Sequence, residues 1–84
     1  MTIRALIGSV QALALQHGIE NSLLAKLENA QRKVDAGHSQ GACGSLGAYI
    51  NEVKAQAGKK LEPAYAQALV ADATAVRDSL GCGA

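Results

Sequence analysis

The residues that most clearly could take part in catalysis form the string G-H-S-Q-G at positions 37–41. It matches the G-x-S-x-G pattern around the nucleophile of serine lipases and esterases, in which a strained strand-to-helix turn exposes the serine oxygen beside oxyanion-binding amides. Ser39 would be the nucleophile, with His38 or His17 as its base and Asp35 as the acid that orients the base. The pattern makes a minimal serine hydrolase, an esterase, one hypothesis for the function.

The surroundings of this string favour a structural explanation. The preceding residues 29–36 have no strand pattern, and a chain of 84 residues is too short for the sheet of an α/β-hydrolase. A glycine that ends one helix and a serine that caps the next account for the same five residues. In this leading interpretation no residue of the chain is catalytic.

Two cysteines, Cys43 and Cys82, are the second chemically informative feature. Cys43 lies near the start of the third predicted helix and Cys82 just beyond the fourth, so antiparallel neighbouring helices would bring the thiols together. A disulfide closing a loop of roughly forty residues would stabilise the fold by about 4 kcal/mol. It would also indicate an extracellular or periplasmic setting. The alternative is a pair of reduced cysteines, and no metal ligands or cofactors are predicted because a second pair of ligands is lacking.

These residues must be positioned by helices, since apolar residues recur at spacings of three and four. The spacing predicts helices over residues 3–16, 21–36, 39–57 and 63–80. Gly18, Gly37 and Gly58 mark predicted helix ends, and Pro63 suits the first turn of the last helix. Short polar residues at the predicted starts supply N-caps, namely Thr2, the Asn21–Ser22 pair and Ser39.

Short connections between the predicted helices imply antiparallel neighbours. We therefore expect the all-α class: a small antiparallel up-and-down four-helix bundle, stapled by the disulfide and forming one domain over residues 1–84. The predicted core includes Leu27, Leu46, Ile50 and Leu69. The two tyrosines, Tyr49 and Tyr65, are expected at the edge of the core with their hydroxyl groups in water.

The net charge of the chain is +1. A nucleic-acid partner is not expected, because phosphate binding needs clustered positive charge. No stretch approaches about eighteen uninterrupted apolar residues, so no membrane span is predicted. The N-terminus lacks the basic start and apolar run of a signal peptide, and a mature or excised domain is expected.

Four stretches of the chain resemble the FIMAH-type helical domain. They are N-S-L-L-A-K-L at residues 21–27, Y-I-N-E-V at 49–53, G-K-K-L at 58–61, and residues 66–73. Such domains are appended, usually C-terminally, to secreted bacterial proteins that include polysaccharide-degrading enzymes and adhesin-like chains. The resemblance covers about residues 3–82 and implies an extracellular, non-catalytic accessory module, without assigning any binding residue.

The leading hypothesis is thus a non-catalytic interaction or spacer module of a secreted bacterial protein, with an unknown protein or polysaccharide partner. The serine hydrolase centred on Ser39 is the alternative, and a small carrier with an apolar interior is a weaker third class. A homodimer is compatible with a bundle that has so few large apolar residues, because pairing would bury more surface.

Overall fold

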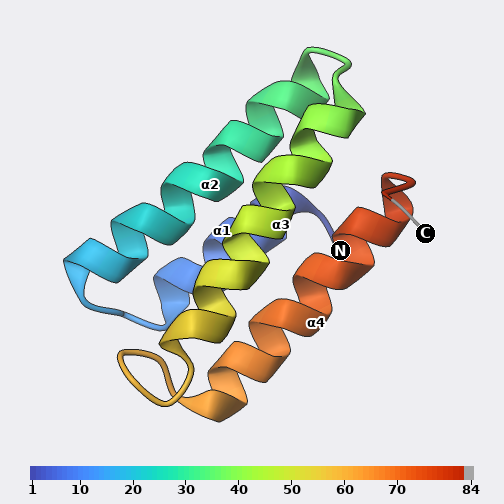
Figure 1. Cartoon of the computed structure of the whole chain (residues 1–84). Helices are drawn as coiled ribbons and strands as arrows, with labels where there is room; N and C mark the ends of the chain where they lie inside the picture. Colours follow the sequence, from blue (N-terminus) through green and yellow to red (C-terminus); the bar gives the residue numbers. More distant parts are fainter. Residues whose placement is uncertain (83–84) are drawn as a thin grey trace.

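The computed structural model describes residues 1–82 and contains four α-helices (Figure 1). They are α1 (Ile3–Ala12), α2 (His17–Asp35), α3 (Ser39–Gln56) and α4 (Pro63–Ser79). Within the described residues the β-structure is limited to an isolated bridge between Ala57 and Leu61. The all-α prediction with four helices is therefore confirmed.

Several helix ends are those that the sequence predicts. The Oγ1 atom of Thr2 accepts a hydrogen bond from the backbone N–H of Ala5 at 3.1 Å, which caps α1. Pro63 occupies the first turn of α4, where its missing N–H leaves no intrahelical bond unmade. Gly37 and Gly58 have positive φ angles of 80° and 79° just beyond α2 and α3. Both predicted breaks are confirmed.

The first break differs from the prediction. Helix α1 ends at Ala12, α2 begins at His17, and Gly18 is an ordinary helical residue near the start of α2. The chain instead reverses through Ala14, whose φ is 51°. Leu13 and Leu15 flank Ala14, are partly buried and pack against the core. These tertiary contacts explain why the chain turns at Ala14 and not at the glycine, Gly18.

Two predicted N-caps are also wrong. The residues at the cap positions of α2 and α3 are Gln16 and His38, and neither side chain makes a capping hydrogen bond. Ser39 is the first residue within α3. The start of α2 is supported instead by Glu20 in its first turn, whose negative charge complements the helix dipole.

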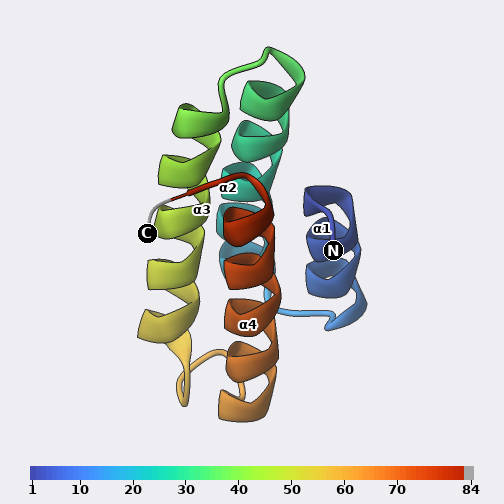
Figure 2. The same cartoon turned by 90° about the vertical axis from the view of Figure 1, so that its right-hand side faces the viewer.

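The helices form a ring in which each contacts two neighbours. Helix α2 packs against α1 and α3, and α4 packs against α3 and α1. Figure 2 shows that α1 and α3 run downwards in that view while α2 and α4 run upwards. Helix α1 has 10 residues and α2 has 19, so α1 covers only part of the length of the bundle.

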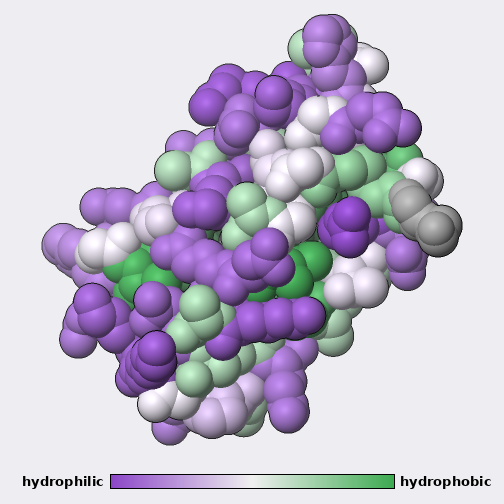
Figure 3. Space-filling model, in the orientation of Figure 1, coloured by the Kyte–Doolittle hydropathy of each residue, from purple (hydrophilic) through white to green (hydrophobic). Residues whose placement is uncertain are grey.

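The core is built from one face of every helix. Leu27, Leu46, Ile50 and Leu69 are all buried, as predicted. Tyr49 lies at the centre of this core with no exposed surface, whereas Tyr65 is 44% exposed. Figure 3 shows hydrophilic residues over much of the α2 side and a paler surface along α3 and towards α4. Among residues 1–82 there is no helix with the length and hydropathy to cross a membrane.

Candidate functional site

The G-H-S-Q-G string forms the turn between α2 and α3. The backbone N–H of Gly37 donates to the carbonyl of Val34 at 3.0 Å, and that of His38 donates to the carbonyl of Lys33 at 2.7 Å. These bonds, together with the positive φ of Gly37, form the Schellman motif that ends α2. The carbonyl of His38 then accepts from the N–H of Ala42 and begins α3. The string thus lies between two helices, not after a strand.

The four residues of the hydrolase hypothesis are only partly brought together. Asp35, His38 and Ser39 lie in or beside the α2–α3 turn. His17 is the first residue of α2 and Asp35 the last, a separation of about 27 Å at 1.5 Å per residue. The Oδ1 atom of Asp35 accepts from Gln31 at 2.9 Å. Within residues 1–82 no hydrogen bond joins the side chains of Asp35, His38 and Ser39.

The predicted disulfide between Cys43 and Cys82 is present, with a Cα–Cα distance of 5.6 Å. A second Schellman motif positions Cys82: its N–H donates to the carbonyl of Arg77 at 2.9 Å, and Gly81 has a φ of 77°. The turn directs the chain from the end of α4 back towards α3. A covalent bond therefore joins the end of α4 to the early part of α3.

A polar cluster that the sequence did not predict joins α2 to α3. The hydroxyl of Ser22 donates to Oε1 of Glu52 at 2.8 Å, and Nζ of Lys26 forms an ion pair with the same oxygen at 2.9 Å. Nζ of Lys26 also donates to the Ser22 hydroxyl at 3.1 Å. One turn further along, Nδ2 of Asn29 donates to Oγ of Ser45 at 3.1 Å.

The chemistry of this cluster is that of a clamp between helices. The proton of Ser22 is directed at a carboxylate that is already paired with Lys26. The side chains of Lys26 and Glu52 are 33% and 20% exposed, so the ion pair is only partly screened by water. Since Ser22 and Lys26 are one turn apart on α2, a single carboxylate from α3 satisfies both.

Tyr49 is the buried titratable group of the core. Its hydroxyl has no hydrogen-bond partner within residues 1–82. Burial, and to a smaller extent the carboxylate of Asp72, raises the pKa of Tyr49 far above its ordinary value. Because Tyr49 has no exposed surface, the expectation that its hydroxyl would be in water is wrong.

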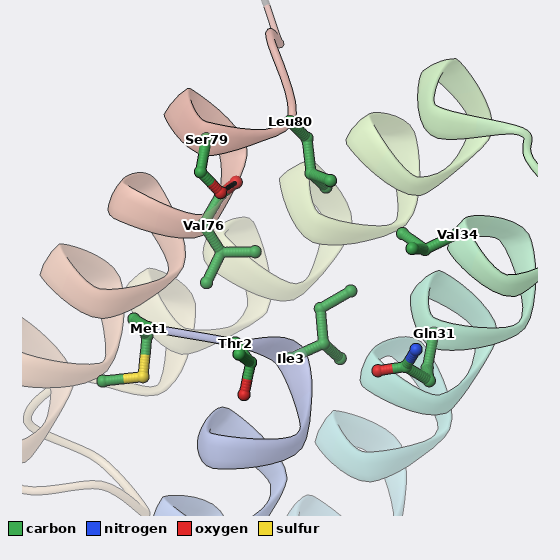
Figure 4. Close-up of a pocket in the computed structure, with 8 residues that line it drawn as sticks. All are labelled: Met1, Thr2, Ile3, Gln31, Val34, Val76, Ser79 and Leu80. Atoms are coloured by element: carbon green, nitrogen blue, oxygen red, sulfur yellow. Dashed lines mark hydrogen bonds between the residues drawn. The ribbon is translucent and has the colours of Figure 1, made fainter.

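Two surface hollows offer places for a ligand. The first, of about 250 Å³, lies between the start of α1 and the ends of α2 and α4, and is called here the uncharged groove. Figure 4 shows the aliphatic side chains of Ile3, Val34, Val76 and Leu80 around it. Its polar side chains are already engaged, since Ser79 donates to the carbonyl of Val76. No Asp, Glu, Lys or Arg lines it.

The second hollow has about 270 Å³ and lies between the end of α3 and the start of α4. It is called here the basic groove and is lined by Lys54, Ala57, Pro63, Ala66, Gln67 and Val70. Most of its wall is aliphatic, with one ammonium group and one amide at its edge. Among residues 1–82 no group of three side chains could hold a metal ion.

A family model, the FIMAH domain, matches residues 2–78 of the chain. The chain belongs to the FIMAH domain family. The family suspected from the sequence is thereby confirmed, and the match extends over all four helices. Comparisons with curated proteins and with solved structures give no match.

The stretches that resemble the FIMAH domain meet in the structure. The block at residues 21–27 supplies Ser22 and Lys26 of the polar cluster, and the block at 49–53 supplies Glu52. The G-K-K-L block forms the α3–α4 loop, in which Leu61 is 2% exposed. In these three stretches, the residues named here hold helices together or shape a loop.

Proposed function

We propose that this FIMAH domain is a non-catalytic interaction module of a larger secreted bacterial protein. The proposal is supported chiefly by the family match over residues 2–78. The Cys43–Cys82 disulfide adds support for secretion, because such bonds persist in oxidising compartments and are rare in the cytosol. The hydrolase alternative has no such support, because His17 lies at the far end of α2 from Ser39 and no hydrogen bond within residues 1–82 joins the side chains of His38 and Ser39.

An esterase assay tests the non-catalytic part of the proposal. Purified oxidised protein and the Ser39→Ala variant are compared for turnover of p-nitrophenyl acetate and butyrate, with Ser9→Ala as a matched control. We expect all three proteins to give the rate of buffer alone, because Ser39 has no base aligned with it. A rate above buffer that only Ser39→Ala abolishes would establish a hydrolase.

The setting is tested in the host cell. Antibodies against the domain are used on culture medium, periplasm and cytoplasm, with free thiols blocked before lysis. We expect a band heavier than 8.6 kDa in the medium or periplasm, with Cys43 and Cys82 unlabelled. A cytoplasmic band with two labelled thiols would contradict the secreted assignment.

A further inference from the structure

The loop between α3 and α4 holds two adjacent lysines on a fixed turn. The N–H of Gly58 donates to the carbonyl of Leu61 at 2.8 Å, and the N–H of Leu61 donates to the carbonyl of Gln56 at 3.2 Å. Leu61 is buried at 2% exposure and anchors the loop in the core. Lys59 and Lys60 lie between these attachment points and are exposed. Their backbone is thus defined before any partner binds.

The basic groove adjoins this loop. The chain leaves the groove wall at Ala57, passes through Lys59 and Lys60, and returns to the wall at Pro63. Lys54 belongs to the wall itself. One lysine thus lines the hollow, and the loop that carries the other two adjoins its wall, at the lower end of the molecule in Figure 2.

The charge of residues 53–63, which run from the end of α3 to the start of α4, is not balanced within that segment. Residues 53–63 contain three lysines and one acid, Glu62, an excess of two positive charges in a chain whose net charge is +1. None of the three lysines forms an ion pair within residues 1–82, where the ion pair found is Lys26–Glu52. The uncharged groove, at the other end of α4, has a similar volume but no Asp, Glu, Lys or Arg in its lining.

We propose that the basic groove binds an acidic peptide segment of a partner protein. An aliphatic side chain of that segment occupies the hollow between Ala57, Ala66 and Val70, and carboxylates on either side of it pair with Lys54, Lys59 and Lys60. This inference rests on the proposed function, because it takes the domain to be an interaction module and specifies the class of its partner. A peptide fits better than an oligosaccharide, because its aliphatic side chains match the mostly aliphatic wall of this hollow.

The wall composition supports the same choice. No aromatic side chain lines the basic groove, so it lacks the flat ring faces that sugars and bases would stack on. Its alanine, proline and valine side chains offer instead a surface for one aliphatic group. The exposed lysines supply attraction and orientation for an acidic segment.

The test is a titration followed by NMR amide shifts of nitrogen-15-labelled oxidised protein. The probe is the capped peptide E-D-L-D-E, and the control peptides are E-D-S-D-E and K-K-L-K-K. We expect shifts for E-D-L-D-E at residues 54–70, roughly tenfold weaker binding for E-D-S-D-E, and none for the basic peptide. Raising the salt to about 0.5 M should weaken binding strongly.

Two double variants complete the test. Lys59→Glu with Lys60→Glu reverses the charge of the loop, and Arg4→Glu with Arg32→Glu makes the same change in net charge at exposed sites outside the groove. We expect about tenfold loss of E-D-L-D-E binding for the first and less than about twofold for the second. Circular dichroism verifies that each variant is folded.

Shifts at the uncharged groove, or equal binding of the leucine and serine peptides, would overturn the proposal. So would binding of polygalacturonate or of phosphatidylglycerol vesicles without binding of E-D-L-D-E, since a polysaccharide or a membrane would then be the partner. Such a failure would not affect the non-catalytic assignment, because the esterase assay that tests it depends on neither the lysines nor the peptide.

Discussion

The spacing of apolar positions predicts that the ring of Tyr49 is buried, but not that its hydroxyl is buried too. It lies three residues after Leu46 and four before Val53, so it belongs to the buried face of α3. The spacing places the ring on this face but does not give the depth of its hydroxyl, which depends on the helices opposite. A buried donor without a partner costs about 1–3 kcal/mol, so the hydroxyl weakens a core that its ring fills.

We expect Tyr49→Phe to increase the free energy of unfolding by about 1 kcal/mol, because it removes the unpaired hydroxyl and keeps the ring. Urea unfolding followed by circular dichroism measures the change. Tyr65→Phe, at a side chain that is 44% exposed, is the matched control and should alter stability by less than about 0.5 kcal/mol. A clear loss of stability in Tyr49→Phe would show that the hydroxyl has a partner.

The same pair of proteins gives a dependence on pH. Because the pKa of Tyr49 is raised in the folded state, above about pH 10 the unfolded chain has lost a proton that the folded chain retains. Stability should then fall by about 1.4 kcal/mol for each pH unit, in addition to the effects of other groups. Tyr49→Phe should lack this component. If the free energy of unfolding of the two proteins fell with the same slope between about pH 9 and 11, the raised pKa of Tyr49 would be refuted.

The candidate site was only partly predictable from single residues. The disulfide followed from the order of the helices, and the α2–α3 turn followed from Gly37. The polar cluster did not follow, because Ser22 and Glu52 are 30 residues apart in sequence and pair only when the faces of α2 and α3 are in register. The spacing of Ser22 and Lys26, one turn apart beside apolar positions, was the available signal.

At the scale of elements, the sequence shows which residues permit a helix to end more readily than it shows at which of them the helix does end. Gly37 and Gly58 end helices because they adopt φ values that other residues avoid. Gly18 has the same freedom and does not use it. The turn through Ala14 is set by the contacts of Leu13 and Leu15 with the core, which local propensity does not contain.

We predict that two substitutions at this first break each stabilise the domain. Ala14→Gly should raise stability by up to about 1 kcal/mol, because it relieves a left-handed alanine. Gly18→Ala should also stabilise, by up to about 1 kcal/mol, because Gly18 is helical and a Cβ there meets no atom within 4 Å. Had the chain reversed at Gly18, Gly18→Ala would instead destabilise the domain. Thermal unfolding of both variants distinguishes the two positions.

At the scale of the whole molecule, the ring of helices closes through α1 and through the disulfide. Helix α1 joins α2 to α4, which do not pack directly against each other. Its 10 residues leave the ends of α2 and α4 apart, and the uncharged groove lies there. The end of α4 is held on its other side by the Cys43–Cys82 bond. Two short attachments thus fix the last helix of a small core.

We expect the disulfide to supply a large part of the net stability. Cys43 and Cys82 are 39 residues apart, for which the chain-entropy relation gives about 4 kcal/mol. In a domain of this size each kcal/mol shifts Tm by about 4–8 °C, so reduction should lower Tm by roughly 15–30 °C. Calorimetry with and without reductant measures the shift, and intact mass verifies that two protons are regained.

The double variant Cys43→Ala with Cys82→Ala separates the bond from any other effect of the reductant. Its Tm should match that of the reduced protein and should not respond to reductant, because no other cysteine is present in the chain. If the variant melted as high as the oxidised protein, packing of α4 against α1 and α3 would be sufficient to hold it.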